Sequence, residues 1–170
     1  MDLVLILMRL LHIVLGVFWA GTLIFQALFL IPAIRDAGPE GAKVAAGLMR
    51  RHFFTVLPPV AVLTILSGFW LYWHASLGFQ PAYMRSSTGM TYGLGAMAAI
   101  LAFVLGVTVM RPSMLRAAAL AQAAGAAPPH ERETKLAQAQ VLRARAAQAA
   151  GIAALLLALA TGAMAVGRYV

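Results

Sequence analysis

The chain has 170 residues, of which 62% are hydrophobic and only 11% are charged, and its mean hydropathy is +0.86. A soluble domain of this length needs a polar surface that so few polar residues do not supply, whereas a lipid bilayer removes that need. The absence of cysteine excludes disulfides, thiolate metal sites, iron–sulfur clusters and covalently attached c-type haem. The net charge of +8 does not indicate nucleic-acid binding, because no basic stripe with interleaved aromatic residues lies outside the apolar segments.

Four segments are long enough to cross the hydrocarbon core of a bilayer, which needs about 20 apolar residues. They cover about residues 3–31, 53–77, 90–110 and 149–166. The first is far longer than the apolar region of a cleavable signal, about 7–15 residues, so we expect it to be retained as a span. The predicted fold class is all-α: an integral membrane four-helix bundle in a single transmembrane domain, residues 1–170.

The connections between the spans are predicted to be partly helical. Residues 40–52 are typical of a short surface helix, and residues 78–89 of a loop. The double proline at Pro58 and Pro59 predicts a kink or local unwinding near the start of the second span. Pro112 interrupts the third helix, and no breaker separates the amphipathic stretch after Glu131 from the fourth span. We therefore expect the third and fourth helices to extend past the membrane as a hairpin, residues 111–147.

Lysine and arginine are concentrated on one side of the predicted bundle. Of the thirteen, four lie between the first two spans and six lie in the hairpin. Arg85 and Arg168 lie on the other side, and Arg9 lies within a span. The positive-inside rule places both basic loops in the cytoplasm and both termini outside. We expect a multi-pass protein of a bacterial-type cytoplasmic (inner) membrane, with the lipid bilayer as its main partner.

Small residues mark the expected helix contacts, because close approach of backbones drives packing where lipid gives no hydrophobic attraction between helices. The strip on the third span consists of Gly95, Ala99, Ala102 and Gly106. The strip on the fourth span consists of Gly151, Ala154, Ala158, Thr161, Gly162 and Ala165. These strips predict packing faces and indicate no chemistry.

The first span carries a polar stripe, with members at intervals of three and four residues. The stripe consists of Arg9, His12, Gly16, Trp19, Leu23 and Gln26. His12 lies about 13 Å along the helix from Leu3, well inside the hydrocarbon, where a polar group is a functional-site hypothesis by default. Gly16 leaves room for a flat ligand or for another helix. The alternative for His12 is a plain hydrogen bond to a neighbouring helix.

The second span carries His52 and His74, which are 22 residues and therefore about 33 Å apart, too far to ligate one metal ion. His12 and His74 are the only histidine pair that can meet, although their depths differ by about 8–10 Å. Alternatively, His74 belongs with Trp70 and its aromatic neighbours to an interfacial belt, and His52 is interfacial. Arg9 either snorkels outward or pairs with Asp2, or else binds a propionate or another anionic group.

Two sequence stretches carry a resemblance to a known superfamily. The first span reads RLLHIVLGVFWAGTL, with a histidine seven residues before a tryptophan that is followed by a small residue and glycine, and the second reads LMRRHFFTVLPPVAVLTILSGFWLYW. Over about residues 5–73 the chain resembles the small four-span membrane proteins that include the CopD-type copper-resistance proteins and the HemJ-type protoporphyrinogen oxidases. The resemblance implies a four-helix membrane bundle with His12 as a ligand to haem b or copper. Positions similar to the HemJ-type pattern are Met49-Arg50-Arg51, Pro58, Pro59 and Gly68.

These features favour a membrane protein that holds haem b or a similar redox cofactor, for electron transfer or tetrapyrrole oxidation. In this hypothesis His12 and His74 are metal ligands, and Arg9, Gly16 and Trp19 lie around the cofactor. Two alternatives stay open: copper handling, with the same histidines and methionines as transient ligands, and a structural or assembly subunit of a larger membrane complex or homo-oligomer. Whether the chain is an enzyme is open too; the resemblance implies a protoporphyrinogen-oxidase-like oxidoreductase if it is one.

Overall fold

The computed structural model describes residues 2–170, apart from the side chain of Pro39. Within this part the regular structure is helical, without strands. Four stretches are long and apolar enough to cross a membrane, which confirms the prediction of four long apolar helices. They are α1 (Leu3–Phe25) with the π-helical turn η1 (Gln26–Leu30) and α2 (Ile31–Asp36); α4 (Phe53–Ala75); α6 (Ser87–Leu105) with the π-helical turn η2 (Gly106–Met110) and α7 (Arg111–Gly125); and α8 (Pro129–Val166). The shorter elements are α3 (Gly38–Arg50), α5 (Pro81–Met84) and the 3₁₀ turn η3 (Gly167–Tyr169).

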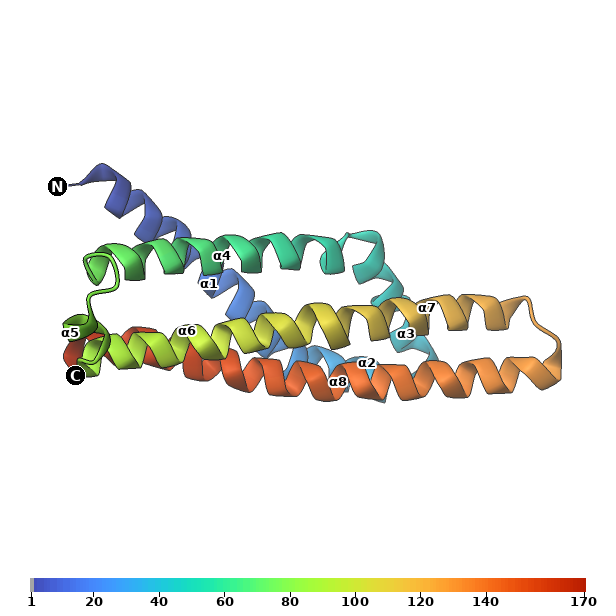
Figure 1. Ribbon diagram of the computed structural model, residues 1–170. Helices are drawn as coiled ribbons and strands as arrows, with labels where there is room; N and C mark the ends of the chain where they lie inside the picture. The colour runs from blue at the N-terminus through green and yellow to red at the C-terminus, as the bar shows by residue number, and fades with distance from the viewer. Residues whose placement is uncertain (1) are drawn as a thin grey trace.

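The long helices form two pairs (Figure 1). In the first pair α1 packs against α4, and in the second α6 and α7 pack along α8. Helix α1 runs obliquely: its N-terminal end stands away from α6 and α8 (Figure 1), whereas α8 is contacted by α1 and by η1 at its C-terminal end. Helix α1 therefore contacts α4 over its first half and joins the two pairs over its second half.

Two prolines set the positions of the π-helical turns. Pro32 and Pro112 each lack a backbone N–H and crowd the carbonyl four residues earlier, and each follows the π-helical turn by two positions. The wider turn relieves this crowding and lets the helix continue, so the first helical stretch reaches Asp36 instead of ending at Ile31. The predicted unwinding at Pro58 and Pro59 is wrong, because α4 is helical through both. They are the sixth and seventh residues of the helix, so each gives up one backbone hydrogen bond, to the carbonyls of Phe54 and Thr55, while the helix continues.

The packing face of α8 differs from the predicted small-residue strip. Gly151, Ala158 and Gly162 are exposed, and no atom approaches the Cβ positions of the two glycines within 4 Å. The buried face consists of Ala146, Ala149, Ala150, Ala153, Ala154, Leu157 and Ala160. The face is therefore made of alanines and one leucine, with the glycines turned outward. Of the predicted strip on the third span, Gly95 and Ala102 are buried and Gly95 lies against α8, whereas no atom approaches the Cβ position of Gly106 within 4 Å.

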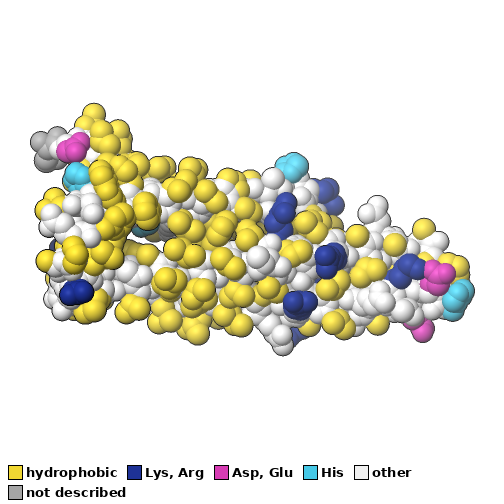
Figure 2. Space-filling view, in the orientation of Figure 1, with side chains coloured by type: hydrophobic (Ala, Val, Ile, Leu, Met, Phe, Trp, Pro, Cys, Tyr) yellow, Lys and Arg dark blue, Asp and Glu magenta, His cyan; other side chains and the backbone are white. Residues whose placement is uncertain are grey.

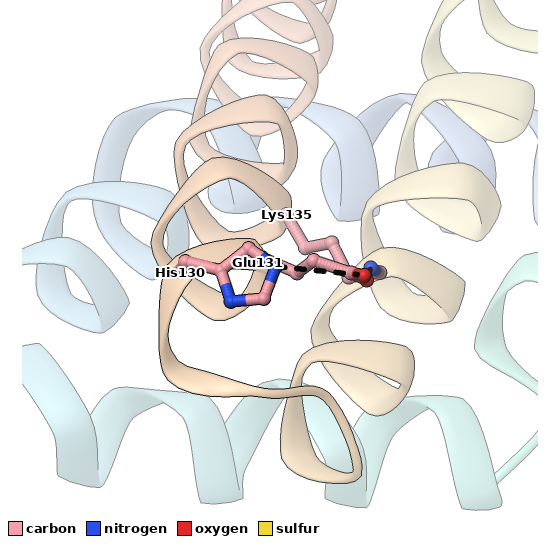
Figure 3. Close-up of polar contacts among 3 residues, drawn as sticks. All are labelled: His130, Glu131 and Lys135. Atoms are coloured by element: carbon pink, nitrogen blue, oxygen red, sulfur yellow. Dashed lines mark hydrogen bonds and ion pairs between the residues drawn. The ribbon is translucent and has the colours of Figure 1, made fainter.

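Helices α7 and α8 continue past α3 and α4 as an antiparallel hairpin (Figure 1). Alanines line its seam, and Ala117, Ala124 and Ala139 are almost completely buried. At the tip, His130 and Lys135 both reach the carboxylate of Glu131 (Figure 3). This exposed ion pairing belongs to the hairpin and contributes little to stability.

Gly95 is the tightest point between α6 and α8. A Cβ there would lie 2.9 Å from the Cβ of Ala163, whereas a Cβ on Gly162 meets nothing within 4 Å. We expect Gly95→Val to lower the free energy of unfolding by about 1–3 kcal/mol through overpacking. Thermal unfolding in detergent measures the effect. Gly162→Val is the matched control, and equal melting temperatures for the two variants would contradict this packing face.

Candidate functional site

His12 is the central polar side chain of the α1–α4 contact. It is half-buried, and its Nδ1 lies 2.9 Å from the backbone carbonyl oxygen of Thr64 and 3.3 Å from Oγ of Ser67. The Ser67 hydroxyl donates within α4, with carbonyl oxygens of Leu63 at 2.7 Å and Thr64 at 3.0 Å. His12 is thus held by α4 from its Nδ1 side.

These partners select one tautomer of His12. A carbonyl oxygen only accepts, so the 2.9 Å contact with Thr64 requires a proton on Nδ1. The hydroxyl hydrogen of Ser67 is used within its own helix, which leaves Oγ as a further acceptor for the same N–H. In the neutral ring Nε2 then carries the lone pair. Metal-ligating histidines are commonly oriented in this way, with the second ring nitrogen donating to a carbonyl.

Glycine in α4 makes room for the ring. A Cβ on Gly68 would lie 2.7 Å from Cε1 of His12 and 3.1 Å from its Nδ1, closer than real Cβ contacts. Gly16, one turn further along α1, is different: a Cβ there would lie 3.6 Å from Cγ2 of Thr64, an ordinary contact. The space predicted beside Gly16 is therefore taken by helix α4, and Gly68 is the glycine that the histidine requires.

An open groove of about 550 Å³ lies beside this contact, between the first half of α1 and the second half of α4. Its walls are Met8, Leu11, Leu63, Leu66, Ser67, Phe69, Trp70, Trp73 and Phe79. Ser67 is the one hydroxyl among these side chains and also contacts His12. The groove has the size and the mostly apolar lining of small-molecule sites.

His74 lies at the C-terminal end of α4, away from His12. Its ring stacks on that of Trp70 at 5.3 Å and is exposed. His74 is six residues beyond Gly68, which corresponds to about 9 Å along the helix. The structure thus gives no pairing of the two histidines around one ion. The stacking on Trp70 matches the alternative of an interfacial aromatic group.

The other predicted site residues are spread along α1. Arg9 is exposed, and the carboxylate of Asp2 caps the helix by accepting from the N–H of Val4 at 3.0 Å. Trp19 is buried at 5% exposure, two turns from His12, where it packs in the core with Leu57 and Ala61. Of the predicted set, His12, Gly16 and Trp19 therefore face α4, whereas Arg9 is exposed and His74 lies apart. In the described part of the chain, no group of three or more His, Cys, Asp or Glu side chains is placed to hold a metal ion.

Sequence reasoning missed Thr64 as the partner of His12. A backbone carbonyl is present at every position, so no side-chain pattern marks the one that accepts. The available signal was Thr64-x-x-Ser67-Gly68, two small hydroxyl residues and a glycine one helical turn apart in an apolar span. Gln26 was in the predicted stripe, and the structure buries its side-chain oxygen without a hydrogen-bond partner in the described part of the chain.

No protein-family model, curated protein or solved structure matches the chain. The resemblance to the CopD-type and HemJ-type proteins therefore stays a prediction, resting on the residues quoted for it.

The fit of His12 over Gly68 is tested by adding one methyl group. We expect Gly68→Ala to push the ring off α4, lower the free energy of unfolding by about 1–3 kcal/mol and lose the Nδ1–H hydrogen bond. Thermal unfolding and ¹⁵N NMR of the imidazole report the two effects. Gly16→Ala is the control, with little change expected. Unaltered stability and ring signals in Gly68→Ala would contradict the packing described here.

Proposed function

We propose that the four long helices cross a bilayer, with both basic loops in the cytoplasm and both termini outside. The exposed side chains along the helices support this placement, because they are mostly large and apolar, as on α1 and on α4. The arginines and lysines between α2 and α4 and in the α7–α8 hairpin give the orientation. A bacterial-type inner membrane is the location that we infer from this distribution.

The absence of native cysteine makes the orientation directly testable. We expect Glu133→Cys in the hairpin to resist a membrane-impermeant maleimide in intact spheroplasts, and Arg85→Cys in the outer loop to react. After lysis both cysteines should react. The reverse labelling pattern would overturn the orientation, and equal labelling in intact spheroplasts would overturn the four-span topology.

We propose further that α1 and α4 hold haem b or a similar redox cofactor, with Nε2 of His12 as a ligand to the metal. The observation that carries this proposal is the 2.9 Å contact of His12 Nδ1 with the Thr64 carbonyl oxygen. It orients the ring and leaves Nε2 as the free lone pair. The 550 Å³ groove beside the contact offers apolar walls for a flat ring system.

The residues of α1 and α4 have distinct proposed roles. Bound haem would supply a one-electron couple, for electron transfer or for tetrapyrrole oxidation by an oxidoreductase. Thr64 and Ser67 hold the proton on Nδ1, and Gly68 lets the ring lie close to the helix. Phe69 and Trp70 in the groove wall exclude water. The exposed guanidinium of Arg9, three residues before His12, is suited to a propionate.

Haem fits the residues better than a bare copper ion, because an iron held by a porphyrin needs only one or two protein ligands. A copper site made by the chain alone needs several ligands. His12 contacts α4 at Thr64, whereas His74 lies further along that helix, stacked on Trp70. Copper handling is the alternative that metal analysis resolves. An assembly subunit is the other alternative, favoured by the first half of α1, which has only α4 as a helical neighbour.

We expect wild-type protein, purified from haem-replete cells, to show a Soret band that His12→Ala abolishes. His52→Ala is the matched control, since His52 is exposed at the other end of α4 and should leave the band intact. His74→Ala should also retain it, because His74 is offset from the His12 contact. A colourless wild-type preparation would overturn the haem proposal. Copper in that preparation would favour copper handling. A membrane protein that co-purifies in stoichiometric amount would favour the assembly subunit.

A further inference from the structure

Arg111 lines a small crevice at the inner end of the bundle. The crevice, of about 40 Å³, lies between α1, α4, α6 and η2, and Phe54 and Pro58 are among its other lining residues. Arg50 is the last residue of α3 and Arg51 follows it, four and three residues before Phe54. We refer to Arg50, Arg51 and Arg111 as the arginine cluster. Because Phe54 and Arg111 line the same crevice, the end of α3 and the start of α7 lie near the same opening.

No carboxylate neutralises this cluster. Within residues 2–170 as described, none of its three guanidinium groups makes an ion pair, and all three residues are exposed. The acidic side chains nearest in sequence are already used, since Asp36 contacts Arg35 and Glu40 contacts Lys43. Like charges that share one opening repel each other, so an anion bound there lowers the energy of the folded chain.

The cluster lies where the apolar surface of the bundle ends. On the face shown in Figure 2, lysine and arginine side chains gather between the apolar part of the bundle and the hairpin tip. Helix α3 lies at the same end of α4 and is amphipathic: Ala45, Leu48 and Met49 are half-buried, whereas Lys43 and Arg50 are exposed. Such a helix suits the boundary between hydrocarbon and headgroups.

We propose that the arginine cluster binds the headgroup phosphate of an anionic phospholipid, with the upper part of an acyl chain against the crevice. Guanidinium groups bind phosphate oxygens in pairs of parallel hydrogen bonds, and basic sites between helices at the cytoplasmic boundary suit anionic headgroups. The apolar lining favours a lipid over a soluble phosphate, because Phe54 and Pro58 offer no polar contact. This inference rests on the membrane placement proposed above and is independent of His12 and its cofactor.

The test is native mass spectrometry of the full chain, released from nanodiscs of equal parts phosphatidylglycerol and phosphatidylcholine. We expect the wild type to retain phosphatidylglycerol selectively. The triple variant Arg50→Gln, Arg51→Gln, Arg111→Gln should retain about a hundredfold less, because about 1 kcal/mol for each of three arginines near the surface amounts to roughly two factors of ten. The matched control is Arg85→Gln, Arg132→Gln, Arg168→Gln, which removes the same charge away from the crevice and should keep the lipid.

Three results would overturn the proposal: equal retention of both lipids by the wild type, equal loss in both triple variants, or full thermal protection by inorganic phosphate alone. Failure of the membrane placement is seen separately, as wild-type protein in the soluble fraction without detergent. Melting temperatures measured in neutral detergent should be alike for the two triple variants. A lower lipid count in the cluster variant then reports binding instead of misfolding.

Discussion

The hydrogen bond between His12 and the Thr64 carbonyl is the contact on which the arrangement of α1 depends. In the proposed membrane placement two helices gain no hydrophobic attraction for each other, so small residues and polar contacts decide where they meet. The N-terminal end of α1 stands away from α6 and α8, and α4 packs against this helix (Figure 1). His12 and Ser67 supply the polar side-chain contacts there, and Gly68 supplies the close approach. The open groove lies beside this contact, between the first half of α1 and the second half of α4.

The features predicted well from the sequence are those set by local composition. An apolar run of sufficient length has few alternatives to a helix, because every backbone polar group must be bonded within its own segment. The third-span strip around Gly95 was visible for a similar reason, since a Cβ at this position would lie only 2.9 Å from the Cβ of Ala163. On α8 this reasoning failed. Alanine is common on all sides of this helix and marks no single face. The prediction therefore relied on Gly151 and Gly162, which lie on an exposed face.

The candidate site was predictable in part, for a physical reason. A histidine in an apolar span is conspicuous, whereas its partner at Thr64 is a main-chain oxygen that no pattern distinguishes. The helix rise predicts that His12 and His74 lie at different depths. Whether a tilt of the helices brings them together depends on how α1 packs on α4, which the sequence does not give. The structure stacks His74 on Trp70 instead. The π-helical turns were not predicted, because a proline such as Pro112 predicts an interruption of the helix, whereas one wider turn accommodates it.

Helix α1 also links the two ends of the molecule. Its N-terminal half carries His12 against α4, and two turns further Trp19 and Leu23 line the crevice next to which the arginine cluster lies. Gly16 and Trp19 follow His12 on the same face, where Gly16 lies against Thr64 and Trp19 packs with Leu57. The pair α6–α8 is packed differently, through alanines and Gly95 at close range. Both proposed binding sites therefore lie along the face of α1 that meets α4.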